Sequence, residues 1–78
     1  MIAKVFTTTR CAYCPMVKRF LASKGVEYEE INAEEQEGRA EAIRVSGAMT
    51  VPITVIGERV IIGYNPGKLA DAIRQTNV

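Results

Sequence analysis

Strand-like and helix-like patterns alternate along the whole chain, and this alternation constrains its fold more than any single residue does. The short apolar run Ile2–Phe6, with β-branched Ile2 and Val5, is typical of a strand. A helical stripe of apolar side chains follows and ends before Gly25; it comprises Met16, Val17, Phe20 and Leu21. The segment Val26–Ile31 predicts a second strand. A strand, a helix and a strand in succession form a parallel, right-handed unit, which we expect here.

The middle of the chain predicts a second helix over residues 34–46. Ala40 and Ile43 are expected to face inward, and Gly47 is expected to end the helix. Gly38 weakens the first turn, because a glycine inside a helix costs about 1 kcal/mol relative to alanine.

The last third of the chain predicts a hairpin followed by a third helix. The β-branched runs Ile53–Ile56 and Val60–Ile62 are separated by Gly57–Glu58–Arg59, which is a turn signal. Asn65 suits an N-cap and Pro66 suits the first helical position. The inner face of this helix is expected to carry Leu69, Ala70 and Ile73.

These elements predict an α/β fold of order βαβαββα, with a mixed four-stranded sheet flanked by three helices. A chain of 78 residues is expected to form one domain, residues 1–78. Its apolar runs are too short to span a bilayer, and its first residues lack the features of a signal peptide. We therefore expect a cytoplasmic protein with no membrane partner.

Composition excludes several classes of function. The chain has no histidine, which removes histidine-containing catalytic triads and zinc sites, and its two cysteines cannot form a multi-bridge secreted framework. Residues 1–26 carry five basic and no acidic side chains, whereas residues 27–41 carry seven glutamates and one arginine. We expect the glutamates on a solvated helix face. With a net charge of +1 and five aromatic residues, the chain does not resemble a nucleic-acid binder.

Cys11 and Cys14 stand three residues apart where the first strand gives way to the first helix. A thiolate attacks a disulfide, so a redox cysteine needs surroundings that favour the anion. A helix start offers unpaired N–H groups and the positive end of the helix dipole, and Arg10, Lys18 and Arg19 add positive charge. We therefore expect Cys11 to be the exposed nucleophile with a lowered pKa, and Cys14 to be the shielded resolving thiol.

Two other interpretations of the cysteine pair stay open. A structural zinc ion needs four ligands, so this pair could hold zinc or an iron–sulfur cluster only across a dimer. A redox-inert interaction domain would keep Cys11 unreactive, as buried cysteines usually are. The strand–helix context favours redox chemistry over both, and no metal site is expected within one chain.

A second motif, Thr50–Val51–Pro52, precedes the run Ile53–Ile56. Proline is common at the start of a strand, where its missing N–H costs no ladder bond. The functional interpretation is a cis proline that exposes the backbone of Val51 for pairing with an extended substrate. Only about 5–6% of X–Pro bonds are cis, so the motif alone is weak evidence for a cis proline. The presence of the cysteine pair in the same chain is what favours the functional interpretation.

Together these motifs resemble those of the glutaredoxin family, over essentially the whole chain. The segment Thr7–Pro15 is similar to the family's active-site segment, and Thr50–Val51–Pro52 to its Thr-Val-Pro with a cis proline. The segment Ile62–Pro66 falls where glutaredoxins usually have Gly-Gly-x-Asp-Asp. The resemblance implies a thioredoxin-like fold, a dithiol mechanism, and substrate or glutathione contacts from one set of residues: Arg10, Tyr13, Thr50, Val51, Pro52, Gly63, Tyr64 and Asn65.

The chain also departs from the glutaredoxin pattern. Ala12 stands where the family usually has proline, and Ile62, Asn65 and Pro66 replace residues that help to hold the γ-glutamyl end of glutathione. The run Gly63–Pro66 is closer to the Gly-Phe-x-Pro of NrdH-type redoxins. Those small proteins reduce ribonucleotide reductase and are recharged by thioredoxin reductase. The resemblance therefore leaves two electron sources open, glutathione and a thioredoxin-reductase system.

We therefore expect a monomeric thiol–disulfide oxidoreductase that carries electrons without a bound cofactor. Cys11 would attack a disulfide, and Cys14 would resolve the mixed disulfide. The expected partners are disulfide-containing target proteins, with ribonucleotide reductase as a candidate, together with glutathione or thioredoxin reductase.

Overall fold

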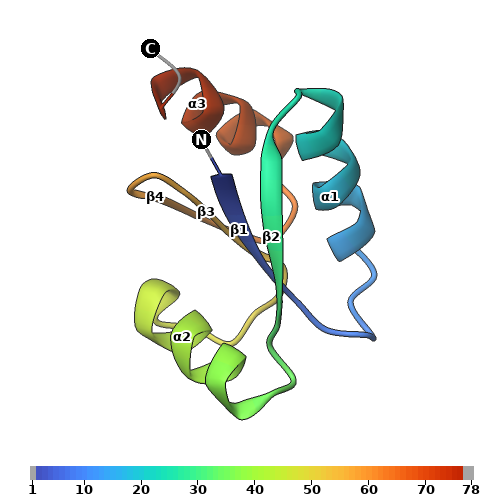
Figure 1. The fold of residues 1–78 in the computed structure, drawn as a ribbon, viewed down its shortest axis with the longest axis vertical. Helices are drawn as coiled ribbons and strands as arrows, with labels where there is room; N and C mark the ends of the chain where they lie inside the picture. The colour runs from blue at the N-terminus through green and yellow to red at the C-terminus, as the bar shows by residue number, and fades with distance from the viewer. Residues whose placement is uncertain (1, 77–78) are drawn as a thin grey trace.

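The fold contains four strands and three helices in the order that the sequence predicts (Figure 1). A computed structural model describes residues 2–76. In chain order the elements are β1 (Ile2–Thr7), α1 (Cys14–Ser23), β2 (Glu27–Asn32), α2 (Gln36–Ser46), β3 (Ile53–Ile56), β4 (Arg59–Ile62) and α3 (Pro66–Thr76). Within residues 2–76, no helix has the length and apolar character needed to cross a membrane.

The sheet is mixed, with strand order β2-β1-β3-β4. β1 and β2 run parallel, and Thr7 lies opposite Asn32. β3 is antiparallel to both of its neighbours, so Ile53 lies opposite Phe6 of β1 and Ile62 of β4. This register gathers the ends of β1, β2 and β4 and the start of β3 at one end of the sheet. We call it the cysteine end, because the loop that leaves β1 there leads to Cys11.

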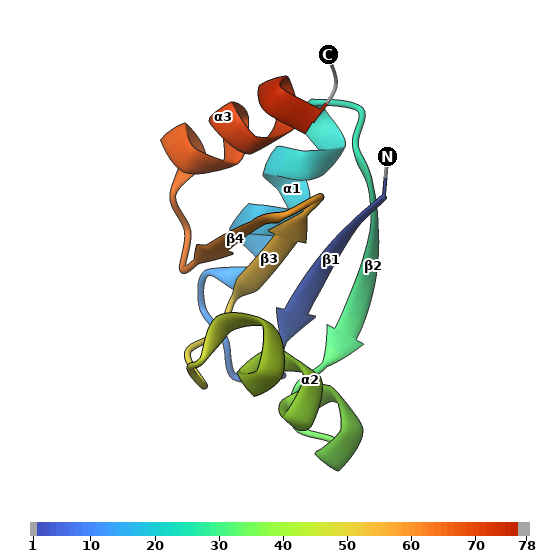
Figure 2. The ribbon, with the colours of Figure 1, turned by 90° about the vertical axis from the view of Figure 1, so that its left-hand side faces the viewer.

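Helices α1 and α3 cover one face of the sheet, and α2 covers the other (Figure 2). Neighbouring residues of β1 serve both faces: Val5 packs under α1 and α3, whereas Phe6 packs under α2. Each fully buried large aliphatic side chain contributes roughly 1.5–3 kcal/mol to folding. The α1–α3 cluster comprises Ala3, Val5, Val17, Leu21, Val26, Ile56, Ile61, Leu69 and Ala72. The α2 cluster is smaller and comprises Phe6, Ala33, Ala42 and Ile53.

The inner face of α2 differs from the one predicted. Gly38 and Ala42 are buried, whereas Ala40 and Ile43 face solvent. The reason is a close approach between α2 and the end of β2, because a Cβ at position 38 would clash with the carbonyl oxygen of Asn32. The glycine that weakens the helix in isolation therefore fixes which side of the helix packs inward.

Smaller corrections concern α1, β2 and the hairpin. Met16 is exposed rather than part of the buried stripe, and Val26 packs in the core just before β2 instead of within it. The hairpin turn has two residues rather than three, because Arg59 already pairs with Ile56. Gly57 opens that turn with a φ of 60°, where a type II′ turn favours glycine.

Thr54 of β3 generates a prediction about stability. Its side chain is completely buried, and its hydroxyl finds no hydrogen-bond partner among residues 2–76. Leaving such a group unpaired costs about 1–3 kcal/mol. Thr54→Val keeps the shape and removes the hydroxyl, so we expect the free energy of unfolding to rise by about 1 kcal/mol in urea denaturation of the oxidised protein.

Thr7→Val is the matched control for this prediction. Thr7 is also buried, but its hydroxyl donates a hydrogen bond to the Glu30 carboxylate. The same substitution there should lower the free energy of unfolding. A Thr54→Val variant that is less stable than the parent protein would show that the hydroxyl is satisfied.

Candidate active site

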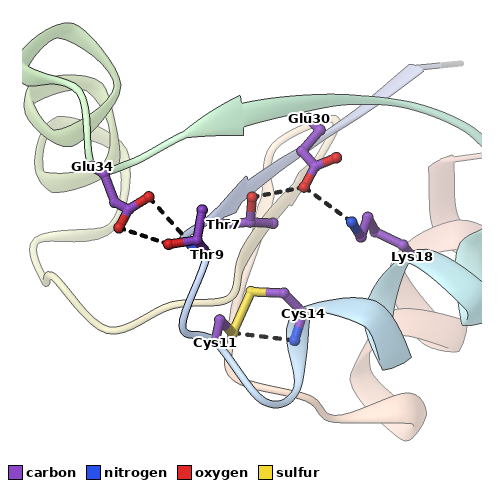
Figure 3. Close-up of polar contacts among 7 residues, drawn as sticks. All are labelled: Thr7, Thr9, Cys11, Cys14, Lys18, Glu30 and Glu34. Carbon is purple, nitrogen blue, oxygen red and sulfur yellow. Dashed lines mark hydrogen bonds and ion pairs between the residues drawn. A yellow bond between two sulfur atoms is a disulfide. The ribbon is translucent and has the colours of Figure 1, made fainter.

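Cys11 and Cys14 form a disulfide at the cysteine end of the sheet, with their Cα atoms 5.5 Å apart (Figure 3). Cys11 lies in the loop between β1 and α1 and is partly exposed. Cys14 is the first residue of α1, and only 2% of its surface is exposed. The two sulfurs therefore have unequal access to an approaching protein, and Cys11 is the accessible one.

The start of α1 directs a backbone donor at Cys11. The Cys14 N–H donates a hydrogen bond to Cys11 Sγ over 3.1 Å. Tyr13 is the N-cap residue, but its side chain makes no capping hydrogen bond, and the first turn of the helix holds no acidic residue. The positive end of the helix dipole therefore acts on the Cys11 sulfur without a competing side-chain acceptor.

The Val51–Pro52 peptide bond is cis, as the sequence predicts. The carbonyl oxygen of Pro52 accepts a hydrogen bond from the Gly63 N–H over 2.7 Å, which ties the segment before β3 to the segment after β4. Pro52 is buried, and Val51 is half-buried against the α2 cluster. Both segments belong to the cysteine end, because Ile53 pairs there with the end of β1.

The other residues expected at the site have different surroundings. Arg10, Tyr13 and Thr50 are exposed, with 58% of the Tyr13 surface accessible. Tyr64 is half-buried and packs against the α1–α3 cluster. Asn65 caps α3 as predicted, and its Oδ1 accepts the backbone N–H three residues further on, over 3.1 Å. The Asn65 oxygen is thus already engaged in holding the helix.

Two glutamates on the β2 side of the disulfide were not among the sequence candidates (Figure 3). Glu30 accepts a hydrogen bond from Thr7 Oγ1 at 2.8 Å and one from Lys18 Nζ at 3.0 Å, both through Oε2. Glu34 accepts hydrogen bonds from the backbone N–H and the hydroxyl of Thr9, at 3.3 and 3.1 Å. The second pair ties the loop that carries Cys11 to the turn between β2 and α2.

The Glu30 carboxylate lies in a cavity of about 470 Å³ that also exposes the disulfide. Its lining includes both cysteines together with Thr7, Lys18, Glu30 and Asn32. The hydrogen bond from Thr7 lowers the pKa of Glu30 below its ordinary value of 4.5, and the hydrogen bond and charge of Lys18 lower it further. Glu30 is therefore a carboxylate at neutral pH. Within residues 2–76, no three side chains of the metal-ligating types gather to hold a metal ion.

Fold and site together define a redox protein of the thioredoxin-like fold with a paired-cysteine centre. The glutaredoxin family model matches residues 3–61, and the chain belongs to the glutaredoxin family.

The similar proteins include both glutaredoxins and NrdH-type proteins, the two groups between which the sequence does not decide. A glutaredoxin from Pseudomonas aeruginosa is 44% identical over 55 residues, which cover 69% of this chain and 66% of that protein. The glutaredoxin-like protein NrdH of Escherichia coli is 29% identical over 62 residues, covering 80% of this chain and 76% of that protein. The solved structure of the Escherichia coli NrdH-redoxin, described as having a thioredoxin-like activity profile, matches with a TM-score of 0.78 over 91% of this chain and 93% of that one. A buckwheat glutaredoxin–glutathione complex matches with a TM-score of 0.72 and 29% identity, over 96% of this chain and 78% of that one.

Proposed function

We propose that this protein is a cytoplasmic dithiol oxidoreductase that reduces protein disulfides, with Cys11 as the nucleophile and Cys14 as the resolving thiol. The observation that supports these roles most directly is the asymmetry of the pair. Cys11 is accessible and accepts a backbone N–H at the helix start, whereas Cys14 is 2% exposed. Hydrogen bonds and positive charge directed at a sulfur favour its thiolate, which is the attacking form.

The reaction balances on the two sulfurs alone. The Cys11 thiolate attacks one sulfur of a target disulfide, forming a mixed disulfide and expelling the other target sulfur, which takes a proton. Cys14 then loses its proton and attacks Cys11, closing the internal disulfide and releasing the second target thiol. The target gains two electrons and two protons, and the protein is left oxidised in the form shown in Figure 3.

Single-cysteine variants test the two roles. We expect Cys11→Ser to abolish reduction of a disulfide substrate, because no accessible nucleophile remains. Cys14→Ser should instead accumulate a mixed disulfide with the target, visible by mass spectrometry after quenching with acid. The roles would be reversed if Cys14→Ser lost its reactivity while Cys11→Ser retained it. Stoichiometric metal or visible colour in the freshly purified protein would instead favour a cluster-binding module.

For the electron source, we propose that a flavin-dependent thioredoxin reductase serves this protein better than glutathione does. The end of β4 and the segment after it support this, because Ile62 is exposed, Pro66 has no N–H and the Asn65 oxygen caps α3. A charged glutathione terminus would lose two or three hydrogen bonds at this segment, each worth about 1.5–3 kcal/mol. The loss corresponds to roughly two powers of ten in affinity or more. Disulfide-containing proteins remain the proposed targets, with ribonucleotide reductase as a candidate from the resemblance to NrdH-type redoxins.

A triple variant tests the proposed electron source. Ile62→Gly, Asn65→Asp and Pro66→Asp together restore the segment typical of glutaredoxins, and aspartate at position 65 can still cap α3. We expect steady-state turnover with glutathione to rise by roughly ten-fold or more, while turnover with thioredoxin reductase and NADPH does not rise. The proposal fails if the unchanged protein already uses glutathione as fast as an ordinary glutaredoxin.

A further inference from the structure

The cavity beside the disulfide opens on the side away from the cis proline. The strand order β2-β1-β3-β4 places Thr50–Pro52 and Gly63 on the β3–β4 side of β1. The cavity instead lies toward β2, where Glu30 and Asn32 line it. None of the residues that the family resemblance assigns to substrate binding lines this cavity, so it needs a separate explanation.

The resolving step requires a route by which the buried Cys14 thiol loses its proton, and this cavity offers one. Cys14 must lose a proton before its sulfur can attack Cys11, yet burial in apolar surroundings disfavours the thiolate. Cys14 is 2% exposed, and it is one of the residues that line this cavity. The proton of Cys14 therefore leaves into this cavity, and charges around the cavity act on it.

Two ionisable side chains line the cavity besides the cysteines, within the part of the chain that the structure describes. Lys18 follows Cys14 by one helical turn, so both lie on the same face of α1. Glu30 faces them from β2 and binds the Lys18 ammonium at 3.0 Å. The remaining lining comes from β1, the loop after it, the first turn of α1 and the end of β2. It adds no charge, because its residues are threonines, Pro15 and Asn32.

We propose that Lys18 and Glu30 are positioning residues that set, with opposite signs, how readily Cys14 gives up its proton. The Lys18 ammonium favours the Cys14 thiolate. Glu30 opposes it, both through its own negative charge and because it neutralises Lys18. Thr7 fixes the Glu30 carboxylate through its hydroxyl, so the pair keeps a defined geometry beside the dithiol. This inference rests on the proposed role of Cys14 as the resolving thiol.

In the resolving step, the Cys14 thiol first gives its proton to solvent in the cavity, and the thiolate sulfur then attacks Cys11 Sγ. The new Cys11–Cys14 bond forms while the bond between Cys11 and the target breaks, and the departing target sulfur takes the electron pair and a proton from water. Lys18 stabilises the negative charge on Cys14 before the attack. Glu30 limits that effect, because its negative charge opposes the thiolate and partly neutralises Lys18.

The test measures the pKa of Cys14 directly, in full-length protein carrying Cys11→Ser. The Cβ chemical shift of Cys14, followed by NMR against pH, reports its ionisation without requiring access to the sulfur. Lys18→Met should raise the Cys14 pKa and Glu30→Gln should lower it, each by about half a unit to one unit. The double variant should lie between the two single variants.

Neighbouring residues provide matched controls. Arg19→Met removes the next positive charge on α1, which lines a different groove with Phe20 and Tyr64. Glu29→Gln removes the next carboxylate on β2, which lies on the opposite face of the sheet with Lys4 and Glu41. Each control should shift the Cys14 pKa much less than its partner substitution does. Thermal unfolding of every variant confirms that the titrated protein is folded.

Opposite signs distinguish an electrostatic role from a structural one. If Lys18→Met and Glu30→Gln shift the Cys14 pKa in the same direction, or no further than the controls, the proposal is wrong. A failure of the proposed function would be seen elsewhere, in the activity of Cys11→Ser and Cys14→Ser, and would leave these titrations unaffected. The two ideas can therefore fail separately.

Discussion

The hydrogen bond from the Cys14 N–H to Cys11 Sγ at the start of α1 is the interaction on which this site depends. It exists because the helix begins at one cysteine and its open first turn faces the other, with no side-chain cap or acidic residue to compete. In the same geometry Cys14 is buried and Cys11 is accessible. One helix terminus thus gives two chemically identical thiols different surroundings, and the roles proposed for them rest on this difference.

The sheet supplies the rest of the site through its register. Because β3 runs antiparallel to β1, the segment Thr50–Pro52 lies at the same end of the sheet as the loop that leads from β1 to Cys11. The Gly63 N–H, in the segment after β4, donates a hydrogen bond to the carbonyl oxygen of Pro52. Because β2 runs parallel to β1, Glu30 reaches the hydroxyl of Thr7 and the ammonium of Lys18. The basic first part of the chain and its acidic second part therefore meet beside the dithiol, where their charges act in opposite directions.

Local features of the site could be predicted from the sequence, and features that depend on distant residues could not. The cysteine pair at a helix start, the Asn65 cap and the element order follow from patterns a few residues long. The ion pair of Lys18 with Glu30 requires the register of two parallel strands and the placement of a helix over them. The inward face of α2 was predicted wrongly, because a contact between Gly38 and the backbone of Asn32 decides it. The glutamates expected on one helix face are instead divided among β2, the turn after it and α2.

The most direct test of this account is the pKa of Cys11 in the reduced protein, measured in the Cys14→Ser variant from the pH dependence of its alkylation rate. A sulfur that accepts a helix-terminal N–H beside basic residues should ionise well below the value of about 8.5 that a free cysteine has. The account predicts half-maximal reactivity below pH 7.5 or so, within the range of about 3.5–7.5 seen for cysteines at helix starts. A pKa at or above about 8.5 would contradict it, because the helix start would then give Cys11 no advantage as a nucleophile.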